Sequence, residues 1–404
     1  MTGYAVGRLK RLSTQWRLQA GSFVPVWAAS VMLSAFLAGC QMDGAPLPKN
    51  AGNDDIKMPS TVVNETYGGE NGPELTLFLR KGASGLYEGA SREVRDGASL
   101  GIGELGNSQL KLRVMDIGAG QAAIAAEVAA AKARGAVMIV SYLPPAETAA
   151  IAAIPPTQRP LLLNLGSPTP TTPGDVFNLV SDEFDSAAEG VRAAVASGHK
   201  KIALLAETNV PQPFMARLGI AISTSGGTFM GSGYYGATDA PADIQAKNRL
   251  LIQASEAVVV LGGTAEVGMV ATAVRGVAVP NQMLVGTNAW PQSSYATPAA
   301  NGVVIALIDP EGSGLIAERY QRHYKHPLTI ASAYGYDAMA IASGLVRSQG
   351  PQALTAANLM SSVGFRGTTG LFRFTATGMV ERKMVVHTIE GGKLKATLPA
   401  SRSF

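Results

Sequence analysis

Two overlapping motifs within residues 97–106 have the spacing of enzyme motifs. GASLG at residues 97–101 matches GxSxG, in which a serine on a strained strand-to-helix turn acts as a nucleophile. GIGELG at residues 101–106 matches GxGxxG, whose glycines bring a dinucleotide pyrophosphate to a helix N-terminus. Both chemistries need a strand before the motif and a helix after it. Apolar residues recur here every four positions, at Ala90, Val94, Ala98 and Ile102. This spacing predicts a helix interior, with Ser99 as an ordinary helix residue, so neither motif indicates catalysis.

Metal ligands and reactive thiols have few candidates in this chain. His323 and His326 are three residues apart near the end of a predicted helix, close enough to share a metal ion. Pro327 ends that helix, however, and the two residues between the histidines supply no carboxylate. The dipole of a helix favours histidine at its C-terminus, which is sufficient to explain the pair. We therefore predict no metal site, no cofactor and no enzymatic activity.

The positive charge of the chain is concentrated at its N-terminus. The 404 residues include 33 Lys and Arg against 29 Asp and Glu, a formal net charge of +4. Four basic residues and no acidic residue lie within residues 1–39: Arg8, Lys10, Arg11 and Arg17. Because charges balance beyond residue 39, a nucleic-acid partner is not expected. With 47% hydrophobic and 15% charged residues, the chain is predicted to fold into two or three globular lobes.

Cys40 is the only cysteine, and it follows a segment typical of export signals. An apolar run at residues 23–38 follows the basic residues, is interrupted by Pro25 and is shorter than the ~20 residues of a spanning helix. Leu-Ala-Gly-Cys at residues 37–40 is similar to the bacterial lipobox, in which cleavage precedes a cysteine that then carries lipid. This resemblance implies a signal peptide at residues 1–39 and lipidation of Cys40. Gln41 in place of Asp implies the periplasmic side of the outer membrane.

A tether is predicted after the lipidation site. Residues 40–73 are rich in Pro, Gly, Asn and Asp and show no sustained periodicity. A flexible chain of this length has an r.m.s. span of roughly 30 Å, enough to hold a folded domain away from a bilayer.

From Glu74 onwards, short apolar runs alternate with longer Ala-rich amphipathic segments. The predicted strands are 75–79, 110–115, 137–141, 161–164, 176–180, 202–206, 229–234, 257–261, 283–286 and 303–308. The predicted helices between them are 88–105, 120–134, 183–197, 214–225, 242–254 and 265–275, and further helices follow at 314–324, 331–347 and 352–362. This alternation predicts an α/β fold with parallel sheets covered on both faces by helices. Two Rossmann-like lobes fit better than a single sheet, and a C-terminal β-hairpin follows at residues 371–388.

Several segments in this order resemble the type 1 periplasmic-binding-protein fold of the Leu/Ile/Val-binding protein superfamily. They include AAAKARGAVMIVS, RPLLLNLGSPTP, ASGHKKIALLAE, QMLVGTNAWP and AYGYDAMAIASGL. The resemblance implies a first lobe of residues 74–180 plus about 304–362. It implies a second lobe of residues 181–303 plus about 363–390, with residues 391–404 as a tail. The hairpin is accordingly expected to pack on residues 181–300.

Two pieces resemble a narrower branch, the penicillin-binding protein activators. They are GTNAWP and the C-terminal FRGTTGLFRFTATGMVERKMVVHTIEGG. This branch implies an outer-membrane lipoprotein that stimulates a peptidoglycan synthase by binding it. The chain departs from the best-known subfamily because only the tether precedes Glu74, where that subfamily has a long helical-repeat domain.

Candidate ligand residues lie where predicted strands end, because open parallel sheets bind ligands beyond their carboxyl edges. They are Ser84, Tyr87, Ser141, Tyr142, Ser167, Glu207, Thr264, Asn288 and Trp290. Turn chemistry is the alternative for each, and Trp290 could instead pack beneath its loop. Amino-acid-binding relatives imply a Ser/Thr-rich loop where this chain has two prolines after Ser141, an acidic residue in place of Asn288, and an aromatic residue near Val210. A zwitterionic ligand therefore fits this sequence poorly.

Two functions remain open from the sequence. The leading hypothesis is a non-enzymatic lipoprotein that regulates peptidoglycan synthesis or envelope assembly by protein contact. The alternative is the substrate-binding lipoprotein of an ABC importer for branched-chain amino acids or a related small solute.

Overall fold

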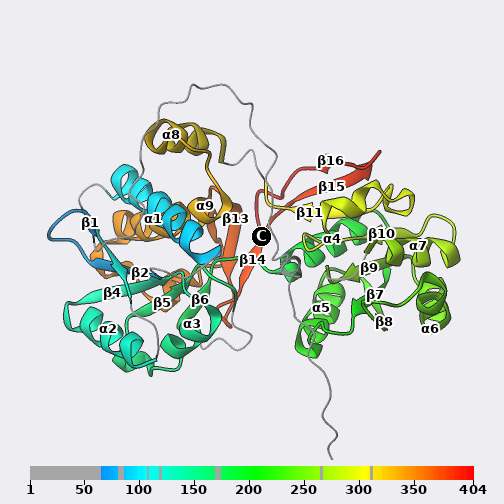
Figure 1. Cartoon of the computed structure of the whole chain (residues 1–404), viewed down its shortest axis with the longest axis horizontal. Coiled ribbons are helices and arrows are strands. Elements are labelled where there is room, and N and C mark those ends of the chain that lie inside the picture. Colours follow the sequence, from blue (N-terminus) through cyan, green and yellow to red (C-terminus); the bar gives the residue numbers. More distant parts are fainter. Residues whose placement is uncertain are drawn as a thin grey trace, which may run out of the picture. The chain divides into compact units, whose positions relative to one another are not determined.

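A computed structural model of the chain describes residues 65–80, 86–106, 109–117, 121–168, 174–263, 267–309 and 313–404, apart from the side chains of 86–88 and 121. The predicted signal peptide, Cys40, Ser84 and Thr264 lie outside the described residues, as does the side chain of Tyr87. Among the described helices, none is long and apolar enough to cross a membrane. The predicted α/β fold class is confirmed (Figure 1).

The first lobe is built on a six-stranded sheet of order β1-β3-β2-β4-β5-β6, in which every pair except β1–β3 is parallel. Its strands are β1 (Glu65–Gly68), β2 (Glu74–Leu79), β3 (Lys111–Asp116), β4 (Ala136–Ser141), β5 (Leu161–Asn164) and β6 (Val176–Asn178). Its helices are α1 (Leu86–Leu105), α2 (Gln121–Ala133), α3 (Pro145–Ala152) and α9 (Ile330–Gln349). Alternate residues of the strands enter two cores: Leu75, Leu77 and Val140 pack with α1 and α9, while Phe78 and Ile139 pack with α2 and α3.

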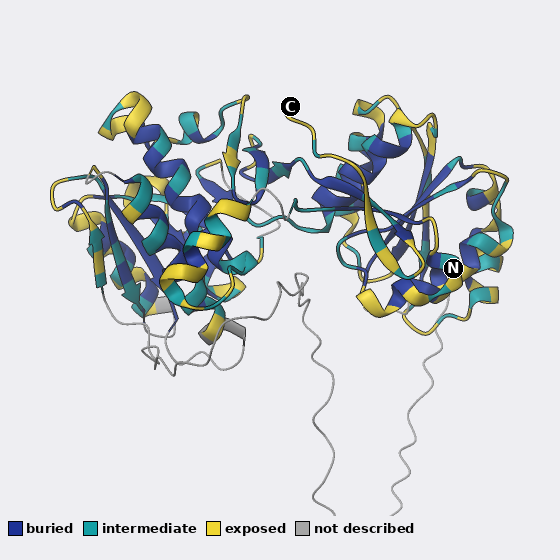
Figure 2. Ribbon diagram, turned by 90° about the horizontal axis from the view of Figure 1, so that it is seen from above, coloured by how far each residue is buried: buried dark blue, intermediate teal, exposed yellow. Residues whose placement is uncertain are grey.

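The second lobe is built on a seven-stranded sheet of order β16-β15-β11-β10-β9-β7-β8. Its strands are β7 (Lys201–Glu207), β8 (Thr228–Tyr235), β9 (Ala257–Leu261), β10 (Met283–Val285), β11 (Val304–Leu307), β15 (Val385–Glu390) and β16 (Lys393–Leu398). One face packs on α4 (Glu183–Ala196) and α5 (Gln212–Thr224), the other on α6 (Pro241–Gln253) and α7 (Val267–Val277). Burial of the central strands on both faces explains why β9 reads AVVVL without alternation (Figure 2).

The hairpin prediction is correct for the turn, and its packing on the second lobe is wrong for residues 371–380 but correct for Val386, which packs with Ala193. A three-stranded antiparallel sheet contains β12 (Phe365–Gly367), β13 (Gly370–Phe374) and β14 (Val380–Arg382), with a turn between β13 and β14. Phe372, Phe374 and Val380 are buried in the first-lobe core with Phe177, not against residues 181–300. The predicted second strand breaks at Lys383 and Met384, and β15 then joins the second-lobe sheet beside β11.

Three expected boundaries also differ from the strand pairing. Val304–Leu307, expected in the first lobe, pairs with β10 and β15 in the second. Glu65–Gly68, expected in the tether, is strand β1, antiparallel to β3. Lys393–Leu398, expected in a tail, is strand β16, paired with β15. All three are short edge elements or crossing strands, whose position depends on a distant partner and not on their own periodicity.

Candidate functional site

The ligand side of the first lobe is set by its strand order. β2 lies between β3 and β4, so the chain leaves β2 toward one neighbour and leaves β4 in the other direction. The helices that follow these two strands, α1 and α3, pack on opposite faces of the sheet. A reversal of this kind opens a crevice beyond the carboxyl ends of the two strands, which is where open α/β sheets bind ligands. In this lobe the strand order therefore places the expected ligand edge at the carboxyl ends of β2 and β4.

Ser141, a predicted ligand residue, points into the lobe. Its side chain is fully buried, and its hydroxyl lies 3.4 Å from the hydroxyl of Thr148 on α3. Thr148 in turn donates to the carbonyl of Leu143 at 3.4 Å. Tyr142 beside it is half-buried, and Pro144 and Pro145 begin α3 without offering amide donors. The hydroxyl groups of Ser141 and Thr148 therefore stabilise the connection between β4 and α3.

Arg80 and Glu147 form an ion pair between the end of β2 and the start of α3. Arg80 directly follows β2, and its side chain is only 7% exposed. Glu147 lies in the first turn of α3, and its carboxylate contacts Nη2 of Arg80. Carboxylates are favoured at this end of a helix. The sequence analysis missed this pair because nothing in the local pattern places residues 80 and 147 together.

Ser167 lies at the surface of the next loop, and its carbonyl helps to order that loop. Asn164, at the end of β5, donates to the Ser167 carbonyl at 3.0 Å and to the side chain of Asn178 at 2.8 Å. The Asn164 side-chain oxygen accepts from Gly166 N–H at 2.9 Å. Ser167 is exposed, so its side chain is accessible to a ligand, and its role as a ligand residue stays a prediction.

In the second lobe, a buried carboxylate ties two strand-end loops together. Glu183, at the start of α4, accepts from Gly262 N–H at 2.8 Å and from the Thr287 hydroxyl at 2.6 Å. Burial raises the pKa of Glu183, while these two hydrogen bonds oppose the rise. Glu207, a predicted ligand residue, is 2% exposed and lies directly beneath Gly262, where a Cβ would come within 2.8 Å of it. Its carboxylate is therefore inside the lobe.

Trp290 and Asn288 also contribute to packing. The Trp290 side chain is buried beneath its own loop and donates from Nε1 to the carbonyl of Val260 at 3.2 Å. Of the two alternatives, the structure thus favours packing for Trp290. The Asn288 backbone N–H donates to Ser186 at 3.0 Å, and the buried oxygen of its half-buried side chain has no hydrogen-bond partner among the described residues.

None of the described candidates lines the cavity beside the three-stranded sheet. A cavity of about 310 Å³ is lined instead by residues around the three-stranded sheet and the C-terminal segment, among them Asp309, Arg366, Leu371 and Arg402. Ser141, Tyr142, Ser167, Glu207, Asn288 and Trp290 are absent from its walls.

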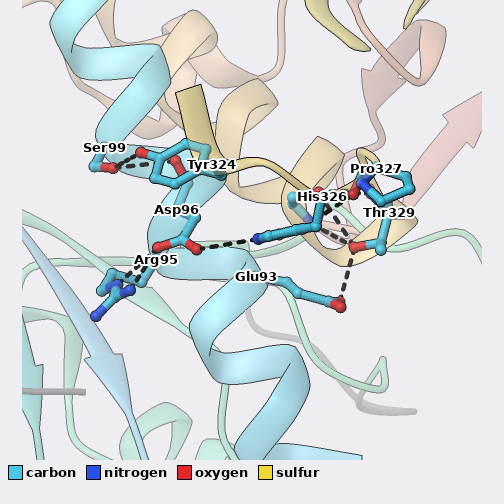
Figure 3. A network of polar contacts seen from close by, with 9 residues as sticks. Glu93, Arg95, Asp96, Ser99, Tyr324, His326, Pro327 and Thr329 are labelled. Atoms are coloured by element: carbon cyan, nitrogen blue, oxygen red, sulfur yellow. Dashed lines mark hydrogen bonds and ion pairs between the residues drawn. The ribbon is translucent and has the colours of Figure 1, made fainter. Parts of the chain in front are cut away.

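His326, the second histidine of the pair, is part of a polar network with residues of α1 (Figure 3). His326 follows α8 (Gly314–Tyr324), and its Nε2 lies 3.7 Å from a carboxylate oxygen of Asp96. The other Asp96 oxygen accepts two hydrogen bonds from Arg95, at 2.7 and 2.9 Å. The nearby Asp96 carboxylate raises the pKa of His326, although burial opposes the rise. Within the described residues, no three metal-ligating side chains form a group.

Ser99 is a helix residue, as predicted, and its motif glycines serve helix packing. Its hydroxyl donates to the Asp96 carbonyl at 3.1 Å and contacts the hydroxyl of Tyr324 (Figure 3). At Gly97, where the GxSxG pattern begins, a Cβ would overlap the carbonyl of Ser332 on α9. At Gly101, a Cβ would lie 2.9 Å from Met339 of the same helix. The motif spacing therefore reflects a close crossing of α1 and α9, not a nucleophile elbow.

The comparisons with known proteins agree with this architecture. The family model for periplasmic binding proteins matches residues 81–393. The chain belongs to the periplasmic binding protein family. The family consists of binding proteins, and the two enzyme-like motifs of this chain lie inside a packed helix. No curated protein matches the sequence.

Solved structures share the fold of this periplasmic binding protein. A putative branched-chain amino acid ABC transporter from Rhodospirillum rubrum is 15% identical, with a TM-score of 0.65 over 81% of this chain and 100% of that one. An ABC transporter substrate-binding protein from Desulfitobacterium hafniense, solved with Leu, is 17% identical, with a TM-score of 0.54 over 80% and 99%. Full-length LpoA from Haemophilus influenzae is 17% identical, with a TM-score of 0.61 over 82% of this chain and 60% of LpoA.

This binding protein also contains a buried polar junction that the sequence analysis missed. Arg382, at the end of β14, is fully buried and donates to the carbonyls of Leu179 and Thr369 and to the hydroxyl of Ser181, at 2.7–2.9 Å. Asp185 lies nearby on α4, and burial, reinforced by Asp182, raises its pKa to about 8 while Arg382 opposes the rise. The sequence pattern could have indicated this junction: Val380, Arg382 and Met384 are two residues apart and share one face of a strand, so an apolar face would bury the charge of Arg382.

Proposed function

We propose that this periplasmic binding protein is a lipoprotein of the outer membrane that acts by contacting other proteins of the cell envelope. The lipobox ending at Cys40 supports the anchor, and the segments that resemble penicillin-binding protein activators support a peptidoglycan synthase as partner. The fold is common to LpoA and to substrate-binding proteins of ABC transporters, so it is compatible with this function.

The observation that carries the proposal is the inward direction of the polar groups at the strand ends. Ser141 bonds within its own lobe, and Trp290 donates to the carbonyl of a neighbouring strand. Glu183 is occupied by Gly262 and Thr287. A solute site needs donors and acceptors that are placed precisely and remain free for the ligand. Asn288 Oδ1 and Arg80 Nη1 lack a hydrogen-bond partner among the described residues, and Ser167 is exposed. The other groups are engaged inside their own lobe, which favours a role in which an exposed surface makes the contact.

The proposal is tested by reconstituting the contact. The protein, with its lipid anchor, is added to a bifunctional penicillin-binding protein of the same bacterium, and glycan polymerisation and crosslinking are measured. We expect a higher rate and direct association of the two proteins. An unchanged rate together with no association, across the synthases of that bacterium, would contradict the proposal.

A substrate-binding component of an ABC importer is the second candidate. The match to complete binding proteins of branched-chain amino acid transport favours it. Leu, Ile or Val at 100 times its Kd would stabilise the protein by ~2.7 kcal/mol, which a thermal-melting experiment detects easily. We expect no shift with millimolar concentrations of any of the three. A clear shift would place the importer function first.

A further inference from the structure

Arg80 is a buried cation at the ligand edge of the first lobe, and it has few hydrogen-bond acceptors around it. Its side chain is 7% exposed, and its Nη1 is buried without a hydrogen-bond partner in the described part of the chain. The only carboxylate paired with it there is that of Glu147. A buried guanidinium presents a planar fork of donors that matches a carboxylate. The position of Arg80, at the point where the strand order reverses, is one where such a fork would meet a bound anion.

A second buried arginine of the same lobe shows what a purely structural guanidinium looks like. Arg159 pairs with Asp175 at 2.7 Å, as Arg80 pairs with Glu147. Arg159 also donates from Nε to the Ile154 carbonyl at 2.9 Å and from Nη1 to the Pro160 carbonyl at 3.2 Å. Backbone carbonyls thus complete the Arg159 site, whereas Nη1 of Arg80 has no hydrogen-bond partner in the described part of the chain. Arg80 therefore has the surroundings of an anion-binding arginine, because its guanidinium pairs with a single carboxylate, that of Glu147.

We infer that Arg80 is the centre of an anion site whose ligand is supplied by the chain itself, the carboxylate of Glu147. Glu147 reaches Arg80 from the first turn of α3, where the helix dipole favours negative charge. Its side chain is 20% exposed, so the position is accessible from solvent. A small carboxylate molecule would take the same place if Glu147 were absent. This inference deepens the proposed function and rests on it, because an internally filled site explains why a carboxylate solute is not needed.

Chemical rescue tests the inference in the full-length protein. Glu147→Ala removes the internal carboxylate and leaves Arg80 buried without a partner, so we expect a fall in melting temperature of about 5–10 °C. Formate or acetate, titrated at constant ionic strength against chloride, should restore much of this loss by binding Arg80. The same anions should leave the wild-type protein unchanged. In Arg80→Met/Glu147→Ala, where no buried cation remains, the rescue should disappear.

Asp175→Ala provides the matched control. It also removes the carboxylate partner of a buried arginine, but the backbone carbonyls around Arg159 remain. We expect formate to restore Glu147→Ala to a greater extent than Asp175→Ala. If Glu147→Ala does not accumulate, Glu147→Ser opens the same space with a residue suited to the start of a helix.

Two results would overturn the inference: a folded Glu147 variant that formate leaves unchanged, or a wild-type protein that formate stabilises equally. Failure of the proposed function gives a different result. Stabilisation of the wild-type protein by Leu, Ile or Val would contradict the function and leave the rescue of Glu147→Ala as it stands.

Discussion

At the scale of single residues, Arg382 has the largest predicted effect on stability. It is fully buried, and its guanidinium carbon lies 4.7 Å from the ring centre of Phe372. It donates to Leu179 and Ser181, in the segment that connects β6 to α4. Arg382→Met leaves these acceptors buried without donors, so we expect a loss of about 3–5 kcal/mol in the free energy of unfolding.

Arg373→Met is the control for this measurement. Arg373 lies on the neighbouring strand, and its pair with Glu381 at 2.8 Å is about one-third exposed. A surface pair of this kind contributes about 1 kcal/mol or less. Urea unfolding of both variants decides the point, and equal losses would show that Arg382 is not a structural junction.

His326 makes the stability depend on pH. The nearby Asp96 carboxylate raises the pKa of His326 in the folded protein above the unfolded value, so folding favours the charged form. The stabilisation is therefore complete below the unfolded pKa, near 6.5, and is lost as pH rises through the folded pKa. We expect wild-type protein to lose about 1 kcal/mol or less relative to His326→Gln as pH increases from 5.5 to 8.5. His323→Gln, which changes the exposed histidine on α8, should keep the wild-type profile. A His326→Gln profile parallel to that of wild type would refute the assignment.

At the scale of elements, the crossing of α1 and α9 depends on backbone contact. A Cβ on Gly97 would overlap the Ser332 carbonyl, and a Cβ on Gly335 would overlap the Val94 carbonyl. Gly97→Ala must therefore separate the two helices, and we expect a loss of about 3 kcal/mol or more in the free energy of unfolding.

Gly103→Ala is the matched control on the same helix. A Cβ at Gly103 would meet nothing within 4 Å, and alanine is the better helix former by about 0.5–1 kcal/mol. This variant should be slightly more stable than wild type by chemical denaturation. Opposite signs for the two substitutions are expected, and a Gly97→Ala protein of wild-type stability would contradict the packing interpretation.

At the scale of the whole molecule, the predicted anchor is Cys40. Lipid on this residue would hold the protein to a membrane. We expect Cys40→Ser to remain uncleaved or to appear in soluble fractions, and to be lost from outer-membrane fractions. Membrane fractionation with immunodetection measures this. Unchanged outer-membrane fractionation of the variant would rule out the lipoprotein assignment.

The sequence by itself determined the fold class and most of the elements, because helix and strand periodicities are local properties of each segment, although strands β1 and β16 and helix α3 were not predicted. Strands 161–164 and 257–261 were predicted to the residue, and Ser99 was placed correctly within a helix. Only the tertiary structure decided which lobe each late strand joins, since β14 and β15 are separated by two residues and pair in different sheets. The same holds for the site. Side chains distant in sequence, such as those of Arg80 and Glu147, come into contact only in the folded lobe. Such contacts determine whether a polar group at the end of a strand is free to bind a ligand.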